Sequence, residues 1–267
     1  MDFNFTDEQN MLRDTVAKFV QNQYDWDSRR AIVKSAAGWR PDLWKVMAEE
    51  LGILGAPFSE DLGGLGGGAV DNMIVMEECG KALVIEPYLG TVVIGGGFLK
   101  HSGHANASDL IAGIIAGDVI TAFAYAEPQG RYNLADLKTT AKKDGSGYVL
   151  NGHKAAVYAA PWATHLLVTA RTGGSRRERA GVELFLVDAK AAGITMREYA
   201  MVDGYRGAEV YFENVAIPGD AHIPGGIELI EQLVDEATVA VCGEAIGISR
   251  KLLDGTLDYT KQRKQFG

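Results

Sequence analysis

The stretch Ala122-Phe-Ala-Tyr-Ala-Glu-Pro-Gln-Gly-Arg-Tyr-Asn133 decides the fold, because the pattern of the chain changes at this point. Its first five residues predict an apolar strand, and Glu127-Pro128 predict a polar turn. Everything before it is helical in pattern, and about the next hundred residues are mostly strand-like. A strand end that opens into a turn at such a boundary commonly lines a ligand pocket. The turn, however, carries bulky Arg131 and Tyr132 where a phosphate-binding loop would have small residues.

Helical patterns fill the chain up to residue 118. Thr6-Asp7-Glu8-Gln9 fits a capping box, which starts a helix of about four turns. Arg40-Pro41-Asp42 opens a second helix, and Gly52 ends it. Further helices are expected over residues 71–83, 88–101 and, capped by Ser108, 109–116.

Strand patterns begin at Val119, separated by turn signals such as Asp144-Gly145-Ser146-Gly147. The strands are expected over residues 119–126, 138–143, 148–158, 165–171, 182–187, 195–201 and 208–212. Strands spaced this closely leave no room for crossover helices, so we predict an antiparallel β barrel or sandwich rather than βαβ units.

A long helix is predicted from about Glu228 to Gln262, with Leu229 and Leu233 on its apolar face. A helix of this length needs partners to cover that face, and the chain offers none after it. We therefore expect a fragment, or partners in another chain. The predicted fold class is α+β, with an N-terminal all-α domain at 1–118, a middle antiparallel β-barrel domain at 119–222 and the first part of a C-terminal helical domain at 223–267.

Composition excludes several classes of function. A formal net charge of -9 argues against general binding to nucleic acid or to anionic membranes. No apolar run reaches the roughly 20 residues that span a bilayer, and no secretory signal is visible, so a cytoplasmic location is expected. Cys79 and Cys242 are expected to be buried free thiols. The five His residues show no metal-ligand spacing, so no metal site is predicted.

Four motifs, in their order and spacing, resemble the acyl-CoA dehydrogenase family of flavoproteins over the whole chain. They are Ala126-Glu127-Pro128, Leu150-Asn151-Gly152-His153-Lys154, Gly204-Tyr205-Arg206-Gly207 with Phe212-Glu213-Asn214-Val215-Ala216-Ile217-Pro218, and Arg263-Lys264-Gln265-Phe266-Gly267. Cys242-Gly-Glu-Ala-Ile-Gly247 is similar to the small-subunit type of pimeloyl-CoA dehydrogenase. The resemblance implies that the long helix begins a C-terminal helical bundle, and that FAD lies between this bundle and the β domain.

The resemblance also implies the reaction, which is α,β-dehydrogenation of an acyl-CoA thioester. A Glu removes the α-proton while hydride leaves the β-carbon for the flavin. The implied partners are the acyl-CoA substrate, electron-transfer flavoprotein as electron acceptor, and a homologous subunit in a homo- or hetero-oligomer. Two alternatives stay open, a non-catalytic structural subunit of a heteromeric enzyme and a flavin monooxygenase or oxidase on the same fold.

The family's flavin-facing strand corresponds to Phe123, Tyr125 and Ala126, whose backbone would lie along the ring. The small Gly-Ser pair that comes after it in the family is replaced here by Arg131 and Tyr132, so the function of that pair is not carried over. The alternative for this stretch is a plain strand and turn that bind no ligand.

A second flavin stretch of the family corresponds to Ala156, Val157 and Tyr158. Ala156 offers no stacking face where the family has an aromatic residue, and Tyr158 replaces a shorter hydroxyl. Ordinary barrel packing explains these residues equally well.

A third group, Arg263, Gln265 and Phe266, matches residues that meet FAD from a neighbouring subunit, where a guanidinium can form bidentate bonds with the pyrophosphate. The alternative is a charged helix end.

The catalytic base is not identifiable. A few members of the family carry the catalytic base on the long helix, at the position that corresponds to Ala237 here. Glu244 lies two turns further on, and a partnered structural role is expected for it. Four arginines near one turn could attract CoA phosphates, although a solvated loop tip is the expected role; they are Arg171, Arg176, Arg177 and Arg179.

Overall fold

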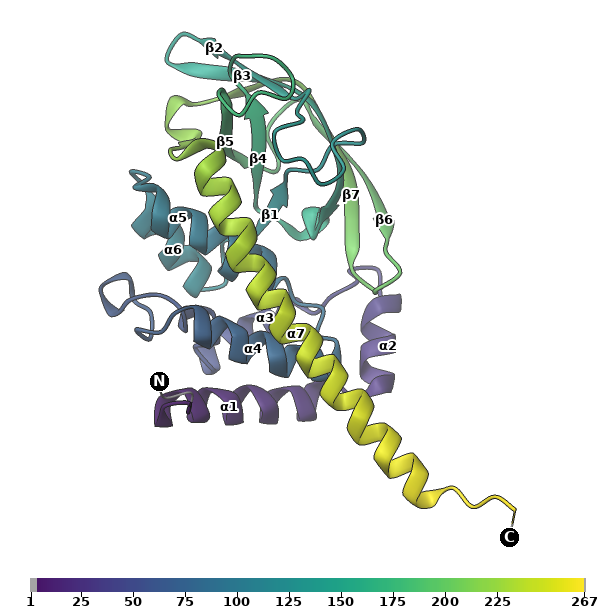
Figure 1. The fold of residues 1–267 in the computed structure, drawn as a ribbon. Coiled ribbons are helices and arrows are strands. Elements are labelled where there is room, and N and C mark those ends of the chain that lie inside the picture. The colour runs from purple at the N-terminus through teal and green to yellow at the C-terminus, as the bar shows by residue number, and fades with distance from the viewer. Residues whose placement is uncertain (1–3, 267) are drawn as a thin grey trace.

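The computed structural model describes residues 4–266 and shows a helical domain, a β domain and one long projecting helix (Figure 1). The helices are α1 (Asp7–Gln23), α2 (Trp26–Lys34), α3 (Pro41–Lys45), α4 (Ala69–Ala82), α5 (Gly96–Ser102), α6 (Ala107–Ile115) and α7 (Gly226–Gln262). Two π-helical segments, Val46–Glu50 and Leu89–Gly95, extend α3 and precede α5. The predicted order of a helical domain, a β domain and a long helix is confirmed.

Local signals set most helix ends. The Thr6 hydroxyl accepts from the Gln9 amide at 3.2 Å, and the Gln9 side chain accepts from the Thr6 amide at 3.1 Å, so the predicted capping box is present. Gly52 adopts a left-handed conformation with φ of 65° and ends the helical stretch that Pro41 opens.

Two helix predictions need correction. No helix is expected from the sequence at α2, which Asp25 caps by accepting from the Ser28 amide at 2.7 Å. Only Ile32 of α2 is buried, so the sequence of α2 lacks the apolar periodicity that predicts a helix. The short helix α6 begins at Ala107 rather than at Asp109, and Ser108 therefore lies inside it instead of capping it.

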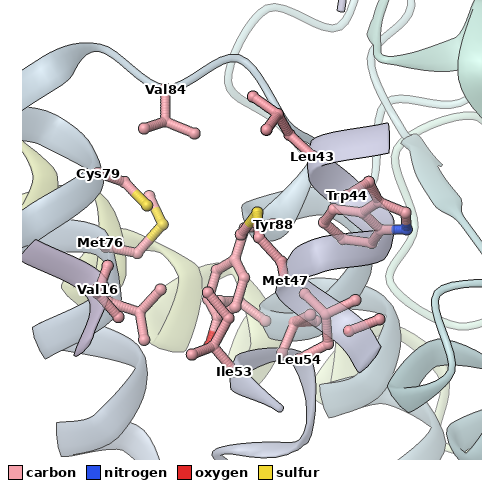
Figure 2. Close-up of a cluster of buried hydrophobic side chains, with 14 of the residues drawn as sticks. Val16, Leu43, Trp44, Met47, Ile53, Leu54, Met76, Cys79, Val84 and Tyr88 are labelled. Atoms are coloured by element: carbon pink, nitrogen blue, oxygen red, sulfur yellow. The ribbon is translucent and has the colours of Figure 1, made fainter. Parts of the chain in front are cut away.

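The main core of the helical domain lies between α1, α3 and α4 (Figure 2). Val16 of α1, Trp44 of α3 and Met76 of α4 are all buried there, together with Tyr88 and Cys79. Burial of this apolar surface is the main force that holds the helices together. The predicted burial of Cys79 is confirmed, whereas Cys242 on α7 is exposed, so that part of the prediction is wrong.

One carboxyl group, that of Glu86, is buried beside this core. It accepts hydrogen bonds from the Tyr24 hydroxyl and, at 3.3 Å, from the Arg40 amide. Burial raises the pKa of Glu86 above its ordinary value, although these hydrogen bonds oppose the change.

Glu86→Gln is expected to stabilise the protein more at pH 8 than at pH 4.5. Because the folded state holds the Glu86 proton more tightly than the unfolded chain does, the stability of the unmodified protein falls as pH rises above the unfolded pKa. The neutral amide keeps one of the two acceptor oxygens, its NH2 group can donate to the Tyr24 hydroxyl oxygen, and the absence of a titrating proton removes this loss. Thermal unfolding of both proteins across this pH range measures the difference, and a constant difference in Tm would contradict the expectation.

The β domain is one eight-stranded sheet. Its strands are β1 (Thr121–Ala124), β2 (Thr140–Asp144), β3 (Gly147–Tyr158), β4 (His165–Arg171), β5 (Val182–Asp188), β6 (Ile194–Ala200), β7 (Arg206–Ile217) and β8 (His222–Ile223). The order along the sheet is β6-β7-β3-β2-β4-β5-β8, and β1 pairs with β4.

Strand direction differs from the prediction at two pairings, both of which involve β4. β1 runs parallel to β4, with Phe123 opposite Leu167, and a single residue pair joins β2 and β4 in the same sense. The remaining neighbours are antiparallel, as predicted. No tight hairpin comes after β1, because the long turn region up to Thr140 separates it from β2, so β1 is free to pair in either direction.

α7 joins the two domains. Its first half packs on α4, where Gly80, Gly243 and Gly247 permit close approach of the two backbones. Its second half projects beyond the helical domain, and from Ser249 to Phe266 every residue is exposed (Figure 1). Leu252, Leu253 and Leu257 are among the exposed side chains, in agreement with the predicted need for partners.

Candidate functional site

The first two stretches that family resemblance assigns to the flavin lie side by side. The Ala155 amide donates to the Ala126 carbonyl at 2.8 Å, so the end of the β1 segment joins β3. The Lys154 ammonium donates to the Tyr125 carbonyl at 3.3 Å. Residues 123–126 and 156–158 therefore border one continuous surface.

A buried ion pair between Lys154 and Glu127 supports this junction. The two charged atoms are 2.9 Å apart, and the Lys154 ammonium also donates to the Thr169 hydroxyl at 3.0 Å. The Glu127 carboxylate accepts further bonds from the backbone amides of Lys138, at 2.7 Å, and Thr139, at 3.0 Å. Both ends of the turn after β1 are thus tied to one buried carboxylate.

The pKa values of this pair reflect burial and mutual attraction. Burial lowers the pKa of Lys154 to about 8, even though the Glu127 carboxylate opposes the change. Burial alone would raise the pKa of Glu127, but the Lys154 charge and the hydrogen bonds from Lys154, Gln129 and the Lys138 amide outweigh it and lower the pKa to about 2. Both groups are therefore charged at neutral pH.

Three aromatic rings in a row connect the helical domain with the surface around Tyr125. Phe98 of α5 contacts Phe123 with ring centroids 5.3 Å apart, and Phe123 stacks on Tyr125 at 4.9 Å. The Tyr125 side chain is 40% exposed, so the last of the three rings can present a face to a ligand.

The second stretch contains a β-bulge. The register between β3 and β7 shifts between Lys154 and Val157, and exposed Ala156 adopts a φ of 51°. Val157 is buried in the core of the β domain, so any flavin contact from Val157 would come from its backbone.

Tyr158 is half-exposed, and its hydroxyl already has a partner. It donates to the Asp203 carboxylate at 3.4 Å, and its ring meets Tyr205 edge-on at 6.0 Å. Arg29 of α2 donates to the Asp203 carbonyl at 2.7 Å, which anchors this loop to the helical domain.

The third group lies apart from the first two. Arg263, Gln265 and Phe266 come after the projecting end of α7, and all three are exposed (Figure 1). The Arg263 guanidinium donates to the Gln265 side chain at 3.1 Å and bonds the Tyr259 hydroxyl. This chain alone does not bring Arg263 to the surface around Tyr125.

The arginines near residue 175 have structural roles. Arg176, Arg177 and Arg179 are exposed, as the predicted solvated loop tip requires, but each forms an ion pair, and buried Arg171 departs from the prediction. Buried Arg171 donates to five hydrogen bonds with backbone carbonyl groups, including that of Ala135 at 2.7 Å. Arg176 and Arg177 both pair with buried Asp136, the latter at 2.9 Å. Arg179 pairs with Glu228 and Glu231 at the start of α7, and it donates to the Glu231 carboxylate at 2.8 Å.

Glu244 differs from its expected partnered role. Its side chain is partly exposed, and no hydrogen bond or ion pair to it is found among residues 4–266. Burial, and to a smaller extent the nearby Asp203 charge, raises its pKa. Ala237, the alternative position for a base, carries no functional group, so the described chain does not identify the catalytic base.

Sequence reasoning missed Lys154, Asp136 and Arg171 as organisers of the site. A signal was present for Lys154, because residues two apart in a strand share a face. Lys154 lies four residues after buried Leu150, so both side chains point to the core side of β3. A charged group on that side must find a buried partner. Asp136 carries no comparable signal, because its partners Arg176 and Arg177 are 40 and 41 residues away. Arg171 bonds mainly to backbone carbonyl groups of its own hairpin, which every residue type supplies, so its partners leave no mark in the sequence.

The exposed ring of Tyr125 offers a flat face to which a planar ring system could bind, and exposed Ala156 and half-exposed Tyr158 lie on the adjoining stretch. The fit is poorer for a diphosphate, because Arg131 and Tyr132 occupy the turn where small residues would admit one. Within residues 4–266 no cluster of three His, Cys, Asp or Glu side chains could hold a metal, and no helix is long and apolar enough to cross a membrane.

The order of a helical domain, a β domain and a long helix is the architecture of an acyl-CoA dehydrogenase-type fold. Comparison with known proteins agrees, because residues 6–117 match the N-terminal domain and residues 122–215 the middle domain of acyl-CoA dehydrogenases. The chain belongs to the acyl-CoA dehydrogenase family, whose members are oxidoreductases acting on CH–CH groups.

Individual relatives support this assignment. Probable acyl-CoA dehydrogenase YngJ of Bacillus subtilis is 29% identical over all of this chain and 72% of its own length. Subunit CarC of the caffeyl-CoA reductase-Etf complex of Acetobacterium woodii is 27% identical over 98% of this chain and 71% of its own. In the ChsE4-ChsE5 complex from Mycobacterium tuberculosis, one chain superposes with a TM-score of 0.88 and 25% identity, covering 100% of this chain and 70% of that one. The chain spans about 70% of the length of these relatives.

Proposed function

We propose that this chain takes part in FAD-dependent α,β-dehydrogenation of an acyl-CoA thioester, as one subunit of an oligomer. The observation that carries the proposal is the surface shared by residues 123–126 and 156–158, held by the buried Lys154–Glu127 pair. Family membership supports FAD as the ring system that this surface receives.

The residues of this chain would bind and orient the cofactor. Tyr125 would offer its ring face, and the backbone around Ala126 and Ala156 would lie along the ring edge, where backbone donors do not depend on side-chain identity. FAD, when bound, supplies the hydride acceptor for the β-carbon. Arg263, Gln265 and Phe266 lie away from this surface, so we propose that they serve a site shared with a neighbouring subunit.

A specific observation favours the second candidate, a non-catalytic subunit that completes a catalytic homologue. Tyr158 is engaged with Asp203, Ala156 offers no ring, and the turn carries Arg131 and Tyr132. The relative in the ChsE4-ChsE5 complex belongs to an assembly of two different chains. A flavin monooxygenase or oxidase on this fold is the third candidate.

We further propose electron-transfer flavoprotein as the electron acceptor, since relative CarC is named as part of a complex with Etf. The cytoplasmic location stays a prediction.

The absorbance spectrum of the full-length protein tests the proposal. We expect a flavin spectrum, either from the protein alone or only after co-expression with its homologous partner, and anaerobic bleaching by an acyl-CoA. A spectrum that needs the partner favours the non-catalytic subunit, and rapid oxygen consumption by the reduced protein favours an oxidase. Absence of flavin from both preparations would overturn the proposal.

A further inference from the structure

A cavity of about 290 Å³ lies where the helical domain meets the β domain. Its helical side is formed by His104, Asn106 and Leu110, from α6 and the segment before it. Its other side is formed by the start of β4, the ends of β5 and β7 and the turn after β7. Most side chains on that side are apolar, and they include Leu186, Val187, Ala191, Ile217 and Pro218. Ligand sites occur preferentially at such domain boundaries.

One of the two histidines that line the cavity is fully engaged. The Nδ1 atom of His104 accepts from the Asn106 amide at 3.2 Å, so the ring proton lies on Nε2, which donates to the Asp220 carbonyl at 2.7 Å. His104 thus joins the helical domain to the turn after β7, and neither of its nitrogens is left for a ligand.

The other histidine, His165, has one nitrogen available. Its Nδ1 atom bonds the Thr164 hydroxyl at 2.9 Å. That hydroxyl is also 3.0 Å from the Ile120 carbonyl, but the carbonyl already accepts from the Thr164 amide at 2.8 Å and from the His165 amide at 3.1 Å. We therefore assign the hydroxyl proton to the bond with Nδ1, which places the ring proton on Nε2. Nε2 has no hydrogen-bond partner within residues 4–266, so it is a free donor at the wall of the cavity.

The charges around His165 favour a neutral ligand. Burial lowers the pKa of His165, although the Asp188 charge opposes the change, so the ring is neutral at pH 7. His165 lies directly opposite Asp188 in the antiparallel pair of β4 and β5, which brings both side chains to one face with Cβ atoms about 5 Å apart. One Asp188 oxygen accepts from the Lys190 amide at 2.8 Å, and the other has no partner in the described part of the chain. None of the described residues that line the cavity is Lys or Arg, so an anion would meet the Asp188 charge without a cation to offset it.

We propose that this cavity binds a small neutral molecule with an apolar ring and a hydroxyl group, which is a phenol-type ligand. The hydroxyl oxygen accepts from His165 Nε2, the hydroxyl proton goes to the free oxygen of Asp188, and the ring lies against the apolar wall. A hydroxyl group is both donor and acceptor, so a single group matches this pair of side chains. The volume is just below the range of about 300–1,000 Å³ for sites of drug-sized ligands, so it suits a single ring.

This site is separate from the proposed flavin surface. β1 and β4 run parallel, with Thr121 opposite His165 and Ala124 opposite Val168. Tyr125 comes directly after Ala124, so His165 lies at the other end of β1, roughly 13 Å away along the strand. The inference therefore does not depend on flavin binding or on the proposed reaction.

Binding of phenol to the full-length protein at pH 7, measured by saturation-transfer NMR titration, tests the inference. We expect saturable binding with a Kd on the order of 1 mM or tighter, because a ligand of this size has few atoms that can contribute. Benzoate has the same ring and a negative charge, so it should fail to displace phenol at equal concentration. Toluene has the ring without the hydroxyl group, so it reports on the apolar wall alone.

Two variants test the pair of side chains that bind the hydroxyl group. His165→Leu removes the nitrogen donor, and Asp188→Ala removes the acceptor from an exposed position. Each should weaken phenol binding about fivefold or more, because one hydrogen bond is lost, and should change toluene binding less than about twofold. Equal losses for phenol and toluene would overturn the assigned pair. Because Asp188 is exposed, its variant decides this point even if thermal unfolding shows that His165→Leu does not fold.

Ala216→Phe tests the cavity itself. Ala216 is exposed and lines the cavity, so a phenyl ring at this position occupies the space of the ligand and should abolish binding of both phenol and toluene. Ala200→Phe, at an exposed position of β6 outside the cavity, is the matched control and should bind both as the unmodified protein does. Absence of saturable phenol binding, displacement of phenol by benzoate, or unchanged binding in Ala216→Phe would overturn the inference.

Discussion

Replacement of Lys154 by Met is expected to destabilise the protein by about 3–5 kcal/mol, because it leaves the Glu127 carboxylate buried without its partner. Lys154 is fully buried, and its ammonium holds Glu127, the Tyr125 carbonyl and the Thr169 hydroxyl within 3.3 Å. Equilibrium unfolding in urea at pH 7 measures the loss. The surface around Tyr125 should loosen as well, which amide exchange of Ala155 would detect.

The double variant Lys154→Met with Glu127→Gln is the matched control. It removes both charges, so it should recover part of the lost stability, since replacing a buried pair by neutral groups costs less than breaking it. A single variant as stable as the unmodified protein would show that the pair does not hold the turn.

The Lys154 variant should also change how stability depends on pH. In the unmodified protein the folded-state pKa of Glu127, about 2, lies below its ordinary value of 4.5, so its contribution is present above pH 4.5 and is lost as pH falls toward 2. Without Lys154, burial raises the pKa of Glu127. The variant should therefore lose less stability at pH 4 than at pH 7, and an equal loss at both pH values would contradict this expectation.

Gly247→Ala is expected to cost about 3 kcal/mol or more and to separate α7 from α4. A Cβ at position 247 would lie 1.9 Å from the Glu77 carbonyl oxygen, which belongs to the backbone of α4 and cannot turn aside. The helices must then move apart, and the packing of buried Gly243 and Ala240 is lost with them. Limited proteolysis of α7 and urea unfolding measure the two effects.

Gly255→Ala provides the matched control on the same helix. A Cβ at position 255 meets no atom within 4 Å, and the residue lies on the projecting part of α7. Alanine is the better helix former there, so this variant should be about 0.5–1 kcal/mol more stable. If both glycine variants behave alike, the close approach of α4 and α7 is not what requires Gly247.

The Lys154–Glu127 ion pair and the close contact of α4 with α7 bear on function because they position the proposed site. The Lys154–Glu127 pair holds the proposed flavin surface and the turn that carries Arg131, whereas the α4–α7 contact directs the end of α7 away from the body. We propose that a site built from both is completed by a second copy or a homologous subunit.

The sequence by itself determined the order of domains, because each element carries a local signal. The capping box at Thr6, the stop at Gly52, the turn between β2 and β3 at residues 145–146 and the long apolar periodicity of α7 all depend on neighbours within a few residues. The family motifs are local as well, so the two proposed flavin stretches could be predicted from the sequence.

Only the tertiary structure decided what these local signals leave open. The parallel pairing of β1 with β4, the burial of Lys154 against Glu127 and the engagement of the hairpin arginines each join residues distant in sequence. Long-range pairs form because buried polar groups must find partners wherever the packed chain supplies them, and no local pattern encodes which partner that is. For the same reason, only the folded arrangement distinguishes Arg131, whose charge is unpaired among the described residues, from the paired arginines of the neighbouring hairpin.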